Sequence, residues 1–264
     1  MHSRDPFNWE AVLSGEDPGI RRFRRLFRRI PRAPRCKMCA APFEGPGAPL
    51  MRAIGRAQWA RNPHYCRICE TWIEHHPGGA ETDLSFLFAD IRGSTRLGES
   101  MSASAFTALL NRFYAAGTRV VVEHEGIVDK FVGDEIVAFF ATPFAGHQHA
   151  AAAVAAAREL LAATGHGDPG GPWVPIGIGV HTGRAFVGTV GEGRTTEFTA
   201  LGDVVNTTAR LASAAGPGEV LVSRVAATAA GLEAGAGEER RLELRGRSEP
   251  VAVVVLRAEA RTAA

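Results

Sequence analysis

Residues 127–140 read I-V-D-K-F-V-G-D-E-I-V-A-F-F, and this stretch decides how the rest of the chain is interpreted. Apolar β-branched and aromatic residues flank a central V-G-D, which predicts two short strands joined by a tight turn. Lys130, Asp134 and Glu135 place ionisable groups at the tip of this apolar hairpin. Charged groups beside a core usually meet a metal, a ligand or a counter-charge, although the same residues also occur in ordinary solvated turns. The hairpin alone leaves both interpretations open.

The composition is that of an ordinary folded protein. The chain has 264 residues, of which 45% are hydrophobic and 22% charged, with a formal net charge of +2. This length allows one substantial domain with a smaller module beside it. So small a net charge argues against a protein dominated by nucleic-acid binding. Because the chain shows neither a long apolar run nor a signal-peptide pattern, we expect a cytoplasmic protein without a transmembrane segment.

The first part of the chain, residues 1–33, is rich in arginine. Residues 21–30 read R-R-F-R-R-L-F-R-R-I, with the apolar residues at helical spacing. This pattern predicts a short basic amphipathic helix. Its partner stays open between the protein itself, a membrane surface with anionic lipid, nucleic acid and an acidic regulator or acidic protein surface.

Residues 34–80 contain two C-x-x-C pairs, formed by Cys36 with Cys39 and by Cys66 with Cys69. In a protein without signs of secretion, such pairs indicate a metal site rather than disulfides. Four thiolates can hold one ion in a tetrahedron, and small modules of this kind fold on their metal. We therefore expect a zinc-ribbon-like module with a structural Zn²⁺, and the alternatives are an iron–sulfur cluster and unliganded or redox-active thiols.

The third predicted domain covers residues 81–264. A buried strand at 84–89 ends at Asp90, and Gly93, Ser94 and Thr95 form a turn whose backbone N–H groups can bind phosphate. The patterns further predict helices at 104–122, 147–163 and 204–215, and strands at 176–183, 184–190, 218–223 and 251–256, with 184–190 as the hairpin partner of 176–183. This order favours an α/β (α+β) fold with a ferredoxin-like βαββαβ core and extra strands.

Asp90 at a strand end and Asp134 at the hairpin tip are expected to converge on neighbouring strands. Paired carboxylates hold hard divalent cations such as Mg²⁺, which take further ligands from water and substrate phosphates. A carboxylate pair beside a phosphate-binding turn suggests two-metal phosphoryl or nucleotidyl transfer.

Four motifs, in this order, resemble the class III adenylyl and guanylyl cyclases. They are L-F-A-D-I-R-G-S-T at 87–95, K-F-V-G-D-E at 130–135, G-V-H-T-G at 179–183 and L-G-D-V-V-N-T-T-A-R-L at 201–211. The resemblance covers roughly residues 83–256. It implies a cyclase catalytic domain in which Asp90, Asp134 and the carbonyl group of Ile91 bind two Mg²⁺ or Mn²⁺ ions per active site.

The resemblance also implies that Lys130 and Thr199 face the purine of the substrate. A lysine can donate to adenine N1, and a threonine hydroxyl can accept from the exocyclic amine. Guanylyl cyclases of the family usually carry an acidic residue at the lysine position, so Lys130 favours ATP. Many adenylyl cyclases have aspartate where Thr199 stands, and the threonine resembles a subgroup that includes bicarbonate-responsive cyclases.

Asn206 and Arg210 match the transition-state pair of the family. Residues four apart share one face of a helix, so the amide can orient the ribose while the guanidinium meets charge on the α-phosphate. The family works as a dimer in which one wall of each site supplies the metal ligands and the other supplies the remaining residues. This chain holds both sets, which predicts a symmetric homodimer with two sites.

These features imply an adenylyl cyclase acting in intracellular signal transduction. The ribose 3′ oxygen of ATP would attack the α-phosphate, giving 3′,5′-cyclic AMP and pyrophosphate. The alternatives are a guanylyl or relaxed-purine cyclase, a non-catalytic nucleotide-sensing domain, and a nucleic-acid-binding protein with an accessory domain.

Overall fold

The structure, a computed structural model, describes residues 8–13, 16–30, 34–36, 38–59, 65–191, 197–247 and 249–260. The chain divides into two compact units. The N-terminal unit comprises Met1–Thr82, Thr142–Phe144 and Ala185–Leu201, and the larger unit comprises Asp83–Ala141, Ala145–Arg184 and Gly202–Ala264. The domain boundaries expected after residues 33 and 80 stay a prediction.

The sheet has the strand order β2-β3-β1-β4-β6-β8-β7, with β5 paired to β4. Strands β1 (Gly79–Ile91), β2 (Ile127–Val132), β3 (Glu135–Ala141) and β4 (Ile176–Val190) are connected through α6 (Ala103–Glu123) and α8 (His149–Ala163). The spatial order β2-β3-β1-β4 of these elements is that of a ferredoxin-like βαββαβ core. The extra strands are β6 (Glu219–Ser223), β7 (Glu238–Leu242) and β8 (Val251–Arg257). The predicted α/β (α+β) fold is therefore confirmed.

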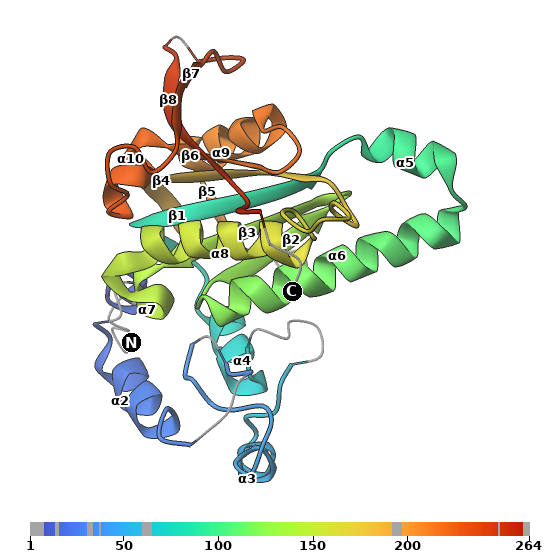
Figure 1. Cartoon of the computed structure of the whole chain (residues 1–264). Coiled ribbons are helices and arrows are strands. Elements are labelled where there is room, and N and C mark those ends of the chain that lie inside the picture. Colours follow the sequence, from blue (N-terminus) through green and yellow to red (C-terminus); the bar gives the residue numbers. More distant parts are fainter. Residues whose placement is uncertain are drawn as a thin grey trace. The chain divides into compact units, whose positions relative to one another are not determined.

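Helices of the larger unit pack on both faces of the sheet, because alternate residues of each strand point to opposite faces. Phe113 of α6, Leu160 of α8 and Ala226 of α10 (Arg224–Ala229) share one core cluster with inward residues of the sheet. Figure 1 shows α6 and α8 on the same side of the sheet. Leu211 of α9 (Asp203–Ala214) belongs to a second cluster with Leu221 of β6. Since Val220 and Val222 of β6 belong to the first cluster, α9 packs on the opposite face.

The predicted hairpin at residues 176–190 is wrong. Residues 176–190 form one continuous strand, β4, whose second half pairs with β5 (Glu197–Leu201). The glycines that suggested a turn instead make room for α9: a Cβ atom on Gly179 would lie 2.5 Å from the Ala212 amide nitrogen. Glycine at this position lets the helix backbone approach the strand.

The remaining helices of the larger unit are short. They are α5 (Ser94–Ser100), η1 (Gly146–Gln148) and α10, and α7 (Thr142–Ala145) begins at a segment of the N-terminal unit. The sequence patterns predicted none of α5, α7, α10 and β7, because elements this short carry little periodicity. The helices expected at 104–122, 147–163 and 204–215 are confirmed as α6, α8 and α9.

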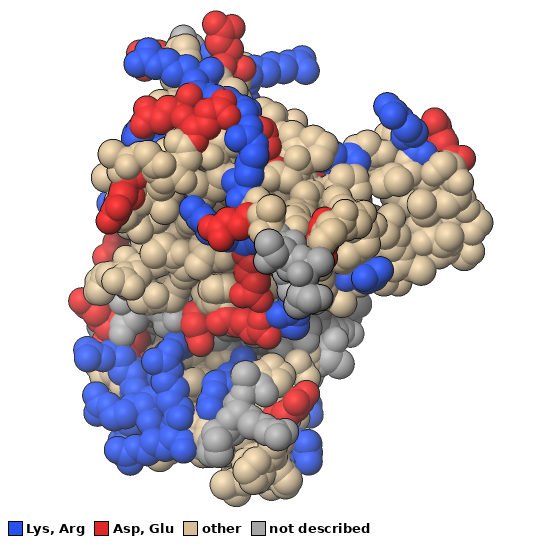
Figure 2. All heavy atoms as spheres, viewed as in Figure 1, with Lys and Arg blue, Asp and Glu red and all other residues tan. Residues whose placement is uncertain are grey.

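The N-terminal unit contains α1 (Trp9–Leu13), α2 (Pro18–Phe27), α3 (Ala48–Ala53) and α4 (Arg67–His75), together with β5. The predicted basic helix is present as α2, although it ends at Phe27 and leaves Ile30 outside the helix. Its N-cap is the Asp17 carboxylate, which accepts from the Ile20 N–H at 2.7 Å. Phe27 of this helix is buried in its own unit, whereas Phe23 and Leu26 are 42% and 53% exposed. Figure 2 shows basic side chains gathered where Figure 1 places α2.

Within the described part of the chain, every helix is too short or too polar to cross a membrane.

Candidate active site and candidate metal centre

Asp90 and Asp134 lie on adjacent elements of the larger unit. β1 pairs antiparallel with β3, so Asp90 lies opposite Glu135, the residue that follows Asp134. The Ile91 N–H also donates to the backbone carbonyl oxygen of Asp134 at 3.3 Å. The end of β1 and the β2–β3 turn are thus joined by backbone pairing, which brings the two predicted metal ligands to one edge of the sheet.

The β2–β3 turn has the predicted hairpin form and is braced from α6. Gly133 adopts φ 62°, a left-handed conformation that glycine takes without strain and that a tight hairpin turn requires. The Tyr114 hydroxyl donates to the Gly133 carbonyl oxygen, and the Tyr114 ring stacks on Phe131 with centroids 4.2 Å apart. Tyr114 was not foreseen from the sequence, because its spacing on α6 marks it only as part of an apolar stripe.

Arg92 partly neutralises the carboxylates of this edge. Its guanidinium forms an ion pair with Asp90, and it also interacts electrostatically with Asp134 and Glu135. Burial lowers the pKa of Arg92, although the negative charges of Asp134 and Glu135 oppose this shift. Burial, with the neighbouring charge of Asp134, raises the pKa of Glu135 to about 7, and Arg92 acts in the opposite direction. The edge therefore concentrates more negative charge than its single arginine balances.

The donor atoms of this edge suit a hard divalent cation. Two carboxylates and the nearby Ile91 carbonyl are oxygen ligands, which Mg²⁺ and Mn²⁺ prefer over nitrogen or sulfur. The Asp90 side chain is 23% exposed, so solvent reaches it. Mg²⁺ usually keeps several waters or substrate oxygens, and a partly open pair of carboxylates leaves space for them. The residues present thus fit the implied metal.

The two predicted purine contacts lie on different strands. Lys130 follows a β-bulge in β2, where the register with β3 shifts between Val128 and Lys130. A bulge of this kind re-aims the side chains that follow it. The Lys130 ammonium lies 3.6 Å from the carboxylate of Asp129, whose side chain is only 5% exposed. Thr199 lies on β5 in the N-terminal unit, where it is 4% exposed and pairs with Gly188 of β4.

Asn206 and Arg210 occupy one face of α9, as predicted. Asn206 is exposed and Arg210 is half-buried. The Arg210 guanidinium lies against Gly246 in the loop between β7 and β8, since a Cβ atom on Gly246 would meet Arg210 Nη2 at 3.2 Å. In the same loop, Arg247 donates to the Asp203 carboxylate at 2.8 Å and to the Thr207 hydroxyl. Sequence reasoning missed Arg247, because its spacing carries no signal of this contact with α9.

Within the described residues, no hydrogen bond or ion pair joins the aspartates of the β1 edge to Asn206 or Arg210. The link between the β1 edge and α9 is Arg92, which donates to the Ser213 carbonyl oxygen at 3.0 Å near the end of that helix. A helix rises about 1.5 Å per residue, so Asn206 lies roughly 10 Å along the axis from Ser213. One protomer thus holds the aspartates of the β1 edge and the Asn206–Arg210 pair as separate groups.

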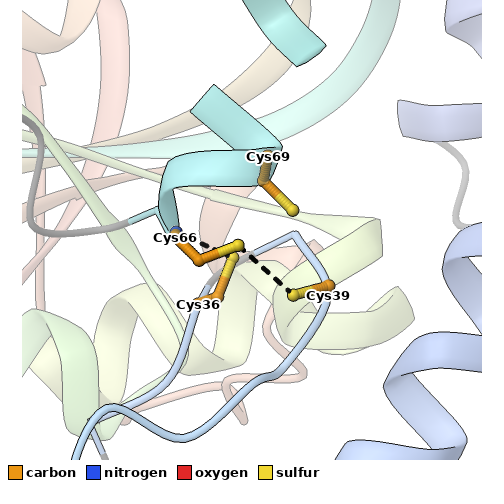
Figure 3. Close-up of side chains that lie close together, drawn as sticks. All are labelled: Cys36, Cys39, Cys66 and Cys69. Atoms are coloured by element: carbon orange, nitrogen blue, oxygen red, sulfur yellow. Dashed lines mark hydrogen bonds between the residues drawn. The ribbon is translucent and has the colours of Figure 1, made fainter. Parts of the chain in front are cut away.

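The four cysteines of the N-terminal unit converge on one point. Figure 3 shows Cys36 and Cys39 projecting from a loop toward Cys66 and Cys69, which come from the start of α4. All four sulfur atoms lie within 4.8 Å of one another, and all four residues are buried. None forms a disulfide. The convergence that the two C-x-x-C pairs predicted is therefore present, and soft thiolate ligands in this arrangement suit a metal ion.

Arg56 lies beside the cysteine cluster, and the thiols shift the pKa values of this arginine and of one another. Arg56 Nη1 lies 3.8 Å from Cys66 Sγ and 3.9 Å from Cys69 Sγ. Burial would lower the pKa of Arg56, but the negative charges of Cys39, Cys66 and Cys69 raise it on balance. Burial raises the pKa of Cys36, whereas hydrogen bonds from the other three cysteines lower the pKa of Cys66.

Comparison with known proteins assigns residues 79–257 to one family. Residues 79–257 match the family profile described as the adenylate and guanylate cyclase catalytic domain. The uncharacterized protein Rv1319c of Mycobacterium tuberculosis is 34% identical over 185 residues, which are 67% of this chain and 34% of that protein. The uncharacterized protein Rv1318c of the same organism is 36% identical over 178 residues, covering 66% of this chain and 32% of the relative. The chain thus spans about a third of the length of the curated relatives it matches.

Two solved structures resemble the chain over its cyclase-like part. The guanylyl cyclase Cya2 has a TM-score of 0.61 and 28% identity, covering 67% of this chain and 93% of that one. The adenylyl cyclase CyaB from P. aeruginosa has a TM-score of 0.57 and 29% identity, covering 69% and 97%. The matched residues include the β1 edge, the β2–β3 turn and helix α9. The chain therefore belongs to the family of adenylate and guanylate cyclase catalytic domains.

Proposed function

We propose that this protein is an adenylyl cyclase that converts ATP to 3′,5′-cyclic AMP and pyrophosphate. The observation that carries the proposal is the backbone pairing of the β1 end with the β2–β3 turn, which brings Asp90 and Asp134 to one edge of the sheet in a cyclase-family chain. This arrangement supports a phosphorus–oxygen lyase of the class III type.

Asp90, Asp134 and the Ile91 carbonyl would hold two Mg²⁺ or Mn²⁺ ions. When bound, such ions neutralise phosphate charge and make the ribose 3′ hydroxyl easier to deprotonate. The Gly93, Ser94 and Thr95 backbone would donate N–H groups to phosphate oxygens.

Lys130 and Thr199 would read the purine. The Lys130 ammonium can donate a hydrogen bond to adenine N1. Guanine N1 carries a proton and therefore cannot accept this hydrogen bond. The buried carboxylate of Asp129, 3.6 Å away, restricts where this ammonium can point. Thr199 would accept from the exocyclic amine of adenine. This Lys/Thr pair supports ATP as the substrate and the Lys/Thr base-reading subgroup.

Asn206 and Arg210 would stabilise the transition state from one face of α9. The Asn206 amide would orient the ribose, and the Arg210 guanidinium would meet negative charge that grows on the α-phosphate. Contact with Gly246 limits the positions open to the Arg210 side chain. Arg247 holds the start of α9 through Asp203 and Thr207, so it acts as a positioning residue for this pair.

A symmetric homodimer would bring the two sets of residues together. Within one protomer the aspartates make no hydrogen bond or ion pair with Asn206 or Arg210 among the described residues. In a homodimer, the aspartates of one copy would face α9 of the other, and two equivalent sites would result.

Product analysis tests the proposal. The purified protein is incubated with equal concentrations of ATP and GTP in the presence of Mn²⁺, and products are identified by mass. Cyclic AMP as the main product supports an adenylyl cyclase. Mainly cyclic GMP, or comparable amounts of both, would instead show the guanylyl or relaxed-purine alternative, which the similar identities of 28% to Cya2 and 29% to CyaB keep in view. Nucleotide binding without any cyclic product would show a non-catalytic sensor.

A further inference from the structure

We propose that Cys36, Cys39, Cys66 and Cys69 bind one structural Zn²⁺ ion, and that this ion positions strand β5 through the aromatic contact between Tyr65 and Phe198. The first half concerns metal binding alone. The second half rests on the proposed function where it concerns Thr199, the residue next to Phe198 on β5.

The spacing of the sulfur atoms matches a single tetrahedral ion. Zinc–sulfur bonds of about 2.3 Å place the corners of a regular tetrahedron about 3.8 Å apart. Cys39 Sγ and Cys66 Sγ are 3.8 Å apart, and no pair in the cluster exceeds 4.8 Å. An iron–sulfur cluster separates its cysteines more widely, because the thiolates bind different iron atoms. The geometry therefore favours one ion over a cluster.

The sulfur atoms lie in a closed environment with two N–H donors beside them. The Cys66 N–H donates to Cys36 Sγ at 3.3 Å, and the Arg56 guanidinium lies beside two of the other sulfurs. The four residues are between 0% and 5% exposed. Such burial closes the site to water, as in structural zinc sites, whereas catalytic zinc sites keep one position open. Arg56 would offset part of the negative charge that four thiolates leave around a divalent ion.

The two C-x-x-C pairs lie on different local structures that the ion would join. The first is a tight loop in which the Ala40 N–H donates to the Cys36 carbonyl and the Cys36 N–H to the Ala41 carbonyl, both at 2.8 Å. The second begins α4, with Cys66 as its N-cap. Cys39 and Cys66 are 27 residues apart in the chain. One ion would thus close a long loop around a small core.

Tyr65 connects the cysteine cluster with strand β5. It directly precedes Cys66, and its ring meets Phe198 edge to face, with centroids 6.3 Å apart at 83°. Trp9 stacks on Phe198 with centroids 5.9 Å apart. Tyr65, Trp9 and Phe198 line a small apolar cavity of about 20 Å³, and Met38, from inside the first C-x-x-C pair, lines it with them. All these residues belong to the N-terminal unit.

Phe198 and Thr199 are neighbours on a strand, so their side chains point to opposite faces. The cysteine module packs against the Phe198 face, which leaves Thr199 on the other. A second attachment lies at the end of the module, where the Gly78 N–H donates to the Thr189 hydroxyl at 2.6 Å and the Thr189 N–H donates to the Gly78 carbonyl at 2.8 Å. Thr189 of β4 pairs with Phe198. The module therefore contacts both β4 and β5 next to Thr199, the predicted purine contact.

Metal content tests the first half. The full chain is purified without added metal and analysed by elemental mass spectrometry together with an assay for inorganic sulfide. We expect one zinc per chain and no sulfide. Chelator-stripped protein should then take up one Co²⁺ and develop the absorption of a tetrahedral thiolate site. Iron with sulfide, absence of bound metal, or zinc retained in both Cys36→Ser and Cys69→Ser would overturn the proposal.

Hydrogen exchange tests the coupling, with a matched pair of variants. Tyr65→Phe keeps the ring against Phe198, whereas Tyr65→Leu removes it, and neither changes a ligand. We expect both variants to keep zinc. Amides of residues 197–201 should exchange about tenfold faster in Tyr65→Leu and in chelator-stripped protein than in wild type and Tyr65→Phe. Residues 127–141 in the larger unit serve as the internal reference. Equal exchange of 197–201 in all four samples would overturn the coupling.

Kinetics then separate this inference from the proposed function. If the wild type produces cyclic AMP, Tyr65→Leu should raise KM for ATP several-fold with kcat nearly unchanged, and Tyr65→Phe should change neither. An unchanged KM in Tyr65→Leu would contradict the link to Thr199. If the wild type produces no cyclic nucleotide, the proposed function fails, while metal content and exchange still decide the zinc site and its hold on β5.

Discussion

The cysteine cluster and the aspartate edge are two candidate metal sites built on opposite principles. The cysteines are soft ligands, between 0% and 5% exposed, and come from a loop and the start of helix α4 in the smaller unit. The aspartates are hard ligands at the edge of a large sheet, with the Asp90 side chain 23% exposed. A closed site suits a permanent ion that stabilises the fold, whereas an open site suits ions that arrive with a substrate.

The two sites also differ in what positions their ligands. The aspartates are positioned by backbone pairing of β1 with β3 and by the Tyr114 brace on the turn, so they need no ion to come together. The cysteines bring together a loop and a helix across 27 residues, and thiolates so close repel one another. Losing the ion should therefore disturb the fold of the N-terminal unit, whereas losing an aspartate should disturb only chemistry.

Asp134→Ala should have the largest effect on turnover. Removing one of the two metal-binding carboxylates should lower kcat by about 10³-fold or more, because ion-stabilised charge contributes several kcal/mol to the transition state. Thermal unfolding should stay close to that of the wild type, since Asp134 lies in a partly exposed turn. Steady-state assays with Mn²⁺ and calorimetry measure the two effects. Glu99→Ala, which removes an exposed carboxylate on α5, is the control. Turnover near the wild-type rate would contradict the metal assignment, and unfolding would break the contrast between the two sites.

Arg210→Ala should lower kcat by about 10² to 10³-fold and leave KM nearly unchanged, because the lost contact forms mainly in the transition state. The control is Arg224→Ala, which removes an exposed arginine paired with Glu239 at 2.5 Å. A larger change in KM than in kcat would instead assign Arg210 to ground-state binding.

Mixing Asp134→Ala with Arg210→Ala sharpens the comparison, because it asks whether the aspartate edge is completed by a second copy. In an equal mixture about half of the dimers would be mixed, and each would hold one intact site. Half of the dimers with one of two sites intact should give about a quarter of wild-type activity. Activity is measured after the subunits have exchanged under native conditions. A mixture no more active than either variant alone would contradict the shared site.

The order of elements and the cysteine convergence could be predicted, since both depend on patterns local in the chain. Alternating strands, amphipathic helices and a V-G-D turn indicated the βαββαβ core, and C-x-x-C spacing indicated the cluster. The error at Gly179 arose because the glycine serves close packing against α9, a contact absent from local sequence. Arg92, Tyr114 and Arg247 were missed for the same reason: each contacts an element distant in the chain, and no local spacing indicates such a contact.

Lys130→Glu should change purine preference more than rate. A carboxylate accepts from guanine N1–H and cannot donate to adenine N1, so the ratio of kcat/KM for ATP to that for GTP should fall roughly 10- to 100-fold. Like charges at residues 129 and 130 should also lower stability, because the Lys130 ammonium now lies 3.6 Å from the buried Asp129 carboxylate. Competition assays measure the ratio, and Lys130→Arg, which keeps the charge, should change it less. An unchanged ratio would remove Lys130 from purine recognition.

The smallest expected effect concerns how each region responds to acid. In the larger unit, burial and the nearby Arg247 lower the pKa of His181 from 6.5 to about 4, although Asp203 acts in the opposite direction. His181 Nδ1 lies 2.7 Å from the Ser223 hydroxyl, within hydrogen-bonding distance. The unfolded chain binds a proton near pH 6.5 and the folded chain only near pH 4, so stability should fall as pH drops between these values. From pH 7 to pH 5 this group should lower the free energy of unfolding by roughly 2 kcal/mol.

Urea unfolding at pH 7 and pH 5, together with hydrogen exchange of peptides from residues 176–184 and from β6, measures this loss within the larger unit. His181→Asn should flatten the pH dependence, and His75→Asn, at an exposed position on α4, should not. Acid also protonates thiolates and releases zinc, so the N-terminal unit should lose stability at low pH by a separate route that His181→Asn leaves intact. His181→Asn should flatten the pH dependence of stability only in the larger unit. An equal flattening in the N-terminal unit would show that the stabilities of the two units are not independent.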